Sequence, residues 1–150
     1  MQHSPPAWST SCKTPGCCVD DDLEQWHARV FAHLLAWPLS RHVDVVYAES
    51  GDGVGQYRIR VSLVDGSLLQ GVERVRAKHG KFITEKYSFH WQRGDGSLIC
   101  RWDNAPHHRE IPSFPDHLHL SDEANVAPHA AVDGFAVMEL IEARGLGQES

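Results

Sequence analysis

Long hydrophobic stretches are missing from this sequence. Hydrophobic residues make up 41% of its 150 residues, but they occur in runs of only a few residues. A helix that crosses a bilayer needs about 20 consecutive apolar residues, so we expect no membrane-spanning helix. Residues 1–6 also lack a basic segment followed by an apolar core, so we expect no secretory signal. These absences predict a soluble, cytoplasmic protein.

Cysteine is scarce and is not arranged in pairs. Three of the four cysteines, Cys12, Cys17 and Cys18, stand near the N-terminus, and Cys100 falls in a predicted strand. No Cys-x-x-Cys pair occurs, which excludes zinc-ribbon and thioredoxin-like motifs. Cys100 is expected to pack as a small buried apolar residue, and nothing requires an oxidising compartment.

Several common catalytic motifs are also absent. The sequence has no Gly-rich phosphate loop of the P-loop or dinucleotide type and no Gly-x-Ser-x-Gly nucleophile elbow. Gly51, Gly53 and Gly55 alternate, but they fall in a predicted turn between strands and do not open a helix. A nucleotide-binding domain and a serine hydrolase are therefore disfavoured.

Charge is distributed unevenly along the chain. The formal net charge is −6, yet residues 56–102 hold nine Lys/Arg and four Asp/Glu and therefore carry +5. A basic middle between acidic flanks is typical of a face that binds phosphate groups or an acidic partner. Lys and Arg that only protect strand edges from pairing would give the same composition.

The chain divides into a tail, one domain and a short end. Residues 1–18 are rich in Ser, Pro, Thr and Cys without periodicity, which predicts a disordered tail. Residues 19–146 are predicted to form a single domain, followed by a flexible end at residues 147–150.

A first helix is predicted to begin near residues 20–22 and to end at Pro38. Asp21 and Glu24 have the spacing of a capping box. Apolar residues at three- and four-residue spacing predict a face buried in the core: Leu23, Trp26, Val30, Leu34 and Trp37.

A series of strands follows the helix. Residues 42–49, 56–64, 67–76, 81–92 and 97–103 have strand composition and are separated by turns. In the second of these segments, apolar residues alternate with Arg58, Arg60 and Ser62, so one face is apolar and the other polar. Asp65-Gly66 is typical of a tight hairpin turn.

The last hairpin gives an expected register. Pairing Gln92 with Ser97 places the aromatic residues of one strand in an apolar layer and the polar residues in the opposite layer. Tyr87 and Trp91 would stack on nucleic-acid bases if exposed, but this register places them in the core. The expected pairs are Trp91–Leu98, Phe89–Cys100 and Tyr87–Trp102 on one face, and His90–Ile99, Ser88–Arg101 and Lys86–Asp103 on the other.

The order of elements predicts an α+β fold. It comprises an N-terminal helix, an antiparallel meander sheet of about four to five strands, an irregular His/Pro-rich loop and a C-terminal helix. The loop follows Asn104. The final helix is predicted over residues 133–144, with Phe135, Met138 and Ile141 inward and Gly145 as its end.

The polar sheet face leads into the His-rich loop, and together they suit metal-free RNA cleavage. Histidine exchanges a proton near neutral pH, and arginine stabilises charge on a phosphate. One group would remove the 2′-hydroxyl proton and another would protonate the leaving 5′ oxygen. The candidate catalytic residues are His90, Arg101, Asp103, His107 and His108, and the candidate substrate-binding residues are Arg58, Arg60, Lys86, Ser88, Asn104, His117 and His119.

A metal site and a structural loop are alternatives for the same histidines. His117 and His119 on an extended segment would point the same way, and with His107 or His108 and Asp103 they would form a tetrahedral zinc or manganese site. Their spacing matches no named zinc motif. Histidines beside prolines also fix loops by hydrogen-bonding carbonyl groups. The main hypothesis requires no cofactor.

Four motifs in residues 87–119 resemble the TumE family, small prokaryotic proteins regarded as the toxin half of toxin–antitoxin pairs. The Arg58-x-Arg60 strand and the Asp65-Gly66 turn add to this resemblance, which covers about residues 20–144. The sequence departs from the family at residues 116–119, where similar proteins more often have consecutive His residues and a Lys. The motifs are Tyr87-Ser88-Phe89-His90-Trp91, the Gly-Asp-Gly turn, Arg101-Trp102-Asp103-Asn104-Ala105-Pro106-His107-His108, and Phe114-Pro115-x-His117-x-His119.

The resemblance implies toxicity and a partner, usually a helix-turn-helix antitoxin encoded alongside. It does not define the target. The helix-then-meander order is also similar to small toxin ribonucleases of the RelE and barnase type, which is an analogy of fold alone. We therefore predict a toxin that acts on RNA as a metal-independent ribonuclease. The alternatives are a non-enzymatic binding module and a metal-dependent hydrolase that uses the His cluster.

Overall fold

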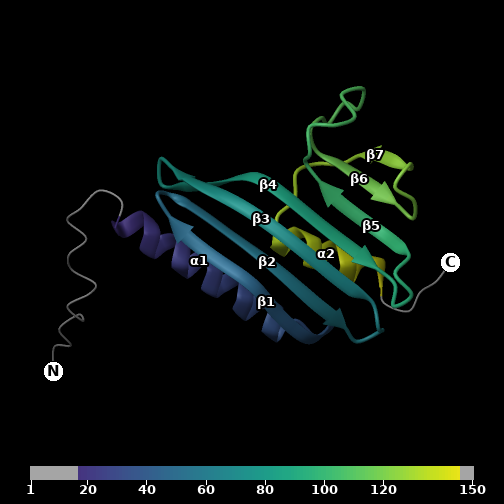
Figure 1. Ribbon diagram of the computed structural model, residues 1–150, viewed down its shortest axis with the longest axis horizontal. Coiled ribbons are helices and arrows are strands. Elements are labelled where there is room, and N and C mark those ends of the chain that lie inside the picture. The colour runs from purple at the N-terminus through teal and green to yellow at the C-terminus, as the bar shows by residue number, and fades with distance from the viewer. Residues whose placement is uncertain (1–16, 146–150) are drawn as a thin grey trace.

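The computed structural model describes residues 17–145 as one antiparallel sheet with two helices (Figure 1). The strands follow one another across the sheet in chain order. The α+β class is confirmed, but the sheet has seven strands rather than four to five. The elements are α1 (Cys17–Ala36), β1 (Ser40–Gly51), β2 (Val54–Leu63), β3 (Leu68–Lys78), β4 (Lys81–Gln92), β5 (Leu98–Asp103), β6 (His117–Leu120), β7 (Val126–Pro128) and α2 (Gly134–Arg144).

Both helices cover the same face of the sheet. Figure 1 shows α1 beside β1 and β2, and α2 behind the middle strands. The apolar stripe predicted on the first helix is buried along its whole length, as are Tyr57, Phe89 and Trp91 on the sheet. Each such side chain contributes roughly 1.5–3 kcal/mol when it is fully buried. Cys100 is buried as predicted, and burial raises the pKa of its thiol to about 12.

Helix α1 begins earlier than predicted. It starts at Cys17, so Asp21 lies inside the helix, and the predicted capping box is wrong. No glycine or proline occurs between Cys17 and Asp22, and acidic residues are favourable near a helix N-terminus. Residues 1–16 and 146–150, which include most of the predicted tail and the flexible end, lie outside the described residues. Neither described helix is long and apolar enough to cross a membrane.

The hairpin between β4 and β5 has a different register from the predicted one, and the six expected pairs are wrong. The turn closes on Arg93 and Ser97, whose backbone groups are hydrogen-bonded at 2.8 Å, and Ile99 is an extra residue opposite β4. Away from this bulge the register differs from the expected one by two residues, so each side chain keeps its predicted face. The observed pairs are Ser88–Asp103, Phe89–Trp102, His90–Arg101, Trp91–Cys100 and Gln92–Leu98.

The segment after Asn104 is not irregular throughout, because it contains β6 and β7. These strands have only four and three residues, too few for a clear sequence pattern. In β6, Leu118 and Leu120 pack against the core, whereas His117 and His119 point to the opposite face. The short strands therefore extend the polar face of the sheet.

Helix α2 begins one residue after the predicted start, with Asp133 as its N-cap. The Asp133 side chain accepts a hydrogen bond from the backbone N–H of Ala136, which satisfies a free donor at the helix start. Met138 and Ile141 are buried as predicted, and Gly145 ends the helix. Phe135 is only partly buried, and Val137 takes the more central place in the core.

A buried carboxyl group connects this helix to the sheet. Glu73 on β3 is 1% exposed and accepts hydrogen bonds from the Tyr57 hydroxyl at 2.7 Å and the Gly134 backbone N–H at 3.1 Å. Thr84 donates a third at 3.1 Å. A Cβ on Gly134 would lie 2.6 Å from the Tyr57 hydroxyl oxygen, so only glycine allows this close approach. Burial raises the pKa of Glu73, although these hydrogen bonds oppose the shift.

The raised pKa of Glu73 predicts a pH dependence of stability. The folded chain keeps the Glu73 proton to higher pH than the unfolded chain, so this group stabilises the fold fully only below its unfolded pKa. That contribution is lost as pH rises through the folded pKa. The Glu73→Gln variant retains a carbonyl acceptor and cannot ionise. Urea unfolding across acidic to neutral pH should show the variant gaining stability relative to wild type as pH rises. A difference that does not change with pH would contradict this assignment.

Candidate functional site on the polar sheet face

The face of the sheet opposite the helices gathers most of the predicted site residues. Side chains of directly paired residues point to the same face, so the strand register defines rows across it. Both rows end in a histidine on β6. The first row is Arg60, Gln70, His90, Arg101 and His119, and the second is Arg58, Val72, Ser88, Asp103 and His117.

A groove lies on this face over β1 to β4. Its lining includes four predicted site residues, Arg58, Arg60, Ser88 and His90. The two arginines are exposed and form no ion pair with any other described residue. Lys86 is also exposed, but it does not line the groove. It lies opposite Arg74 in the β3–β4 register, further along the strands. The groove therefore presents two unpaired guanidinium groups to solvent.

Three histidines form a cluster at the β5–β6 end of the face. The ring centroids of His117 and His119 are 4.9 Å apart, and the His108 ring lies 5.2 Å and 5.8 Å from them. His117 is 2% exposed and His119 is 4% exposed. We call His108, His117 and His119 the histidine cluster. It forms because strand pairing places two members on one face and the loop between β5 and β6 brings the third over them.

Asp103 is the carboxylate against which the cluster packs. It is 6% exposed. Its Oδ1 lies 3.0 Å from His117 Nε2, and its Oδ2 lies 3.5 Å from His119 Nε2. Arg101 donates from Nε to Oδ2 at 3.1 Å, and the Ala105 backbone N–H donates to Oδ1 at 3.0 Å. One buried carboxylate thus contacts two ring nitrogens and two further donors.

The outward ring nitrogens of the two buried histidines are also engaged. Nδ1 of His117 donates to the Pro115 carbonyl at 2.8 Å, and Nδ1 of His119 donates to the Glu123 carbonyl at 2.8 Å. A carbonyl oxygen can only accept, so each Nδ1 carries a proton. This orients both rings with Nε2 toward Asp103. The sequence gives no signal for such carbonyl partners, because any residue type supplies one.

The loop that carries His108 is held at both ends. Asn104 accepts from the Tyr87 backbone N–H and donates to the Glu85 carbonyl, each at 3.0 Å. The Tyr87 hydroxyl donates to Asp116 Oδ1 at 2.7 Å. Burial, together with this hydrogen bond, raises the pKa of Tyr87 well above its ordinary value. Asn104 and Tyr87 therefore hold the loop in place.

The contacts and exposure of several predicted residues bear on the roles expected for them. Arg101 contacts Asp103 and also Glu123, from NH2 to Oε2 at 2.5 Å, so its charge is balanced within the protein. His107 is exposed and lies outside the histidine cluster. Tyr87 and Trp91 are each 3% exposed, which excludes them as stacking platforms for bases. Glu123, which the sequence analysis did not identify, completes the charged surroundings of Arg101.

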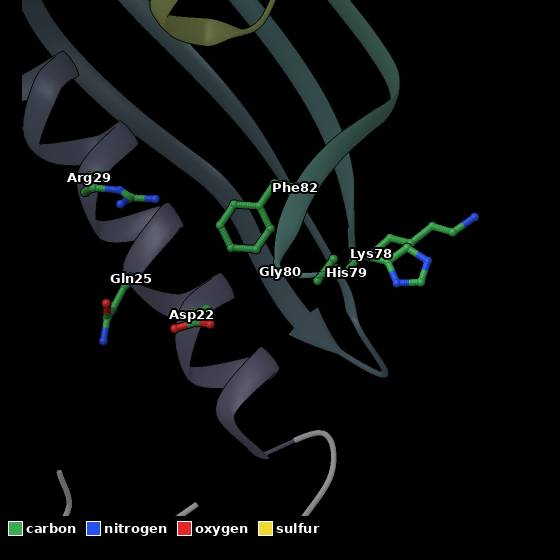
Figure 2. A pocket seen from close by; sticks show the side chains of 8 residues that line it. Asp22, Gln25, Arg29, Lys78, His79, Gly80 and Phe82 are labelled. Carbon is green, nitrogen blue, oxygen red and sulfur yellow. The ribbon is translucent and has the colours of Figure 1, made fainter.

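A second pocket lies at the opposite end of the molecule, between the start of α1 and the β3–β4 turn (Figure 2). Figure 2 shows Lys78 and His79 extending away from the helix, while Gln25 and Arg29 project from the helix itself. These side chains do not converge on a common point. The pocket contains none of the predicted site residues, and the polar face remains the stronger candidate.

The contact between Tyr87 and Asp116 predicts a coupled loss of stability. In Asp116→Ala the buried Tyr87 hydroxyl loses its acceptor, which should cost about 1–3 kcal/mol of unfolding free energy. Tyr87→Phe should cost less, because Asp116 is only half-buried and can be hydrated. The double variant should then resemble Tyr87→Phe in urea unfolding. Full additivity of the two single losses would show that the contact does not hold the loop.

Comparison with models of known protein families shows a match over most of the chain. The family model described as Toxin TumE matches residues 30–144. No similar protein was found among curated proteins, and no similar chain among solved structures. The matched residues run from the middle of α1 to the last residue of α2 and include the whole sheet. The chain therefore belongs to the TumE toxin family.

Proposed function

We propose that this toxin acts on RNA, which it binds along the polar sheet face and cleaves beside the histidine cluster. The observation that supports the proposal most strongly is the continuity of the face. From Arg60 in the groove, one row of paired residues leads through His90 and Arg101 to His119 of the cluster, and Arg58 begins the row beside it. A phosphodiester chain laid along this row would meet binding groups first and proton-transfer groups next.

Arg58 and Arg60 suit the binding of a phosphate backbone. They alternate on β2 and so point to the same face, about 7 Å apart along the strand. Neither guanidinium forms an ion pair with a carboxylate among residues 17–145, although Asp44 lies opposite Arg60 in the same groove, so both are available for charge-assisted hydrogen bonds to phosphate oxygens. Ser88 and Gln70 line the same groove and add neutral hydrogen-bonding groups. The proposed substrate is single-stranded RNA, whose backbone is typically bound along a positively charged groove.

The proposed reaction is an internal transesterification. One histidine takes the proton of a ribose 2′-hydroxyl, and the 2′ oxygen forms a bond to the adjacent phosphorus. The bond from phosphorus to the 5′ oxygen breaks, and a second histidine protonates that oxygen. The products are a 2′,3′-cyclic phosphate and a free 5′-hydroxyl, so no water, oxidant or metal ion is consumed in the step.

Accessibility decides which histidines suit proton transfer. His117 and His119 are buried with both ring nitrogens engaged, so neither can reach a substrate proton. His90 lines the groove and His107 is exposed on the adjacent loop, and we assign the two proton transfers to them. Asp103 and Arg101 act as positioning residues, because Asp103 contacts both buried histidines and Arg101 contacts Asp103.

Membership of a toxin family implies an antitoxin that neutralises the chain. We propose that this antitoxin is a helix-turn-helix protein and that it covers the polar face. A protein with acidic side chains would pair with Arg58 and Arg60, the same groups that bind phosphate in the active toxin. Neutralisation would then follow directly from occlusion of the RNA-binding groove.

Cleavage of total cellular RNA by the purified protein tests this proposal. Wild type should generate fragments with 2′,3′-cyclic phosphate ends, and His90→Ala should lower the cleavage rate by about 100-fold or more. His33→Ala is the matched control, since His33 is an exposed histidine on α1, on the other side of the sheet. Circular dichroism would establish that both variants are folded.

Two results of that assay would contradict the proposal. Equal cleavage by wild type and folded His90→Ala would remove His90 from the mechanism. RNA that binds stoichiometrically without being cut would favour a non-enzymatic inhibitory module in place of a ribonuclease.

A further inference from the structure

The histidine cluster has a donor arrangement that the proposed RNA chemistry does not use. One nitrogen from each of His108, His117 and His119 lies within 4.8 Å of the others. The two strand histidines are almost fully buried and take no direct part in proton transfer. Burying several imidazoles together removes them from water, and such a cluster requires compensation by hydrogen bonds or a bound cation.

The two buried rings each present one nitrogen to the same carboxylate. Nδ1 of both His117 and His119 donates to a backbone carbonyl. Nε2 of His117 lies 3.0 Å from Asp103 Oδ1, and Nε2 of His119 lies 3.5 Å from Asp103 Oδ2. Two imidazole nitrogens and a carboxylate therefore face one another, which is a donor set that zinc binds.

Asp103 and the two histidines are each less than a tenth exposed, so little water is available to solvate their polar atoms. A single divalent cation bound by Nε2 of His117, Nε2 of His119 and the carboxylate would coordinate all of these atoms at once.

We propose that His108, His117, His119 and Asp103 bind one zinc ion. Two ligands of a tetrahedral zinc lie about 3.4 Å apart, given Zn–N distances of about 2.0–2.1 Å. Nε2 of His117 and Nε2 of His119 lie 3.0 Å and 3.5 Å from the two oxygens of Asp103, close to this value. The three imidazole nitrogens must draw together from separations of up to 4.8 Å, and the side chain of His108, 34% exposed on a loop, is the most exposed of the three.

The surroundings of the cluster also suit a metal site. Metal-binding histidines usually donate their other ring N–H to a carbonyl or carboxylate, and both buried members do so here. His108 has a φ of 59°, a left-handed conformation that a non-glycine residue adopts at a cost of about 1–3 kcal/mol. A bond from His108 to zinc would offset that cost. Three imidazoles favour zinc over manganese, which prefers oxygen ligands.

The proposed site has four protein ligands, as structural zinc sites do. The ion would fasten the loop that carries His107 and His108 to β5 and β6. This inference goes beyond the proposed function, because zinc binding does not depend on RNA cleavage. It also differs from the metal-dependent hydrolase considered as an alternative, since the metal stabilises the loop and takes no part in bond breaking.

Metal binding to the purified full-length chain, prepared without a polyhistidine tag and stripped with a chelator, tests the proposal. Titration with Co²⁺ as a visible probe should give the intense absorption of a tetrahedral site at one ion per chain, and Zn²⁺ should displace it. His108→Ala should weaken Co²⁺ binding at least tenfold. His107→Ala is the matched control, because it removes the neighbouring histidine and should bind Co²⁺ as wild type does.

Thermal unfolding supplies a second measurement that does not require the variants to be active. Added Zn²⁺ should raise the Tm of wild type and His107→Ala by several degrees and leave His108→Ala nearly unchanged. No Co²⁺ absorption and no zinc-dependent Tm shift in wild type would overturn the proposal. Equal Co²⁺ affinity of wild type and His108→Ala would overturn it as well. Zinc binding by a chain that does not cleave RNA would contradict the proposed function alone.

Discussion

The pairing of β5 with β6 is the constraint on which the candidate site depends. It sets Asp103 opposite His117 and Arg101 opposite His119, so one carboxylate, one guanidinium and two imidazoles share a small area of the sheet. A shift of one residue would send both histidines into the core and both leucines of β6 to the polar face. The apolar contacts of Leu118 and Leu120 with the core make that shift unfavourable. Core packing on one face therefore positions polar groups on the other.

The one-sided burial of the sheet explains why the polar face is available for function. Helices α1 and α2 cover only the apolar face. The buried Glu73 side chain fixes the start of α2, because it accepts a hydrogen bond from the Gly134 backbone N–H. No helix covers the opposite face in the described part of the chain, so Arg58 and Arg60 are exposed there, whereas the loop after β5 covers the end that holds His117 and His119. Arg58 and Arg60 remain unpaired there, whereas Arg101 is balanced by two carboxylates. This difference separates residues suited to bind a ligand from those that organise the site.

Strong periodic patterns made much of the fold predictable from the sequence. The apolar stripe of α1 and the alternation in β2 are long enough to define a helix and a strand. The Asp65-Gly66 turn indicates the hairpin between β2 and β3. The β6 and β7 strands are too short to show a periodic pattern, and each is stabilised by its neighbouring strands more than by its own few residues. The sequence therefore did not predict them. The β4–β5 register failed for a related reason, since a bulge depends on turn geometry that residue types do not specify.

The candidate site was predictable in composition but not in arrangement. His117-x-His119 correctly indicated two rings on one face, and Asp103 was identified as a neighbour. The sequence did not distinguish His108 from the adjacent His107, because only the conformation of the loop places one ring over the cluster and leaves the other exposed. The carbonyl groups that orient the histidines carry no sequence signal at all.

The polar sheet face is the surface that we propose to be toxic, and bacterial growth after induced expression tests this proposal most directly. Wild type should arrest growth, and the Arg58→Gln/Arg60→Gln double variant should relieve the arrest at equal protein level. The Arg29→Gln/Lys78→Gln variant makes the same charge change around the pocket in Figure 2 and should still arrest growth. Full arrest by a folded Arg58→Gln/Arg60→Gln variant would contradict the claim.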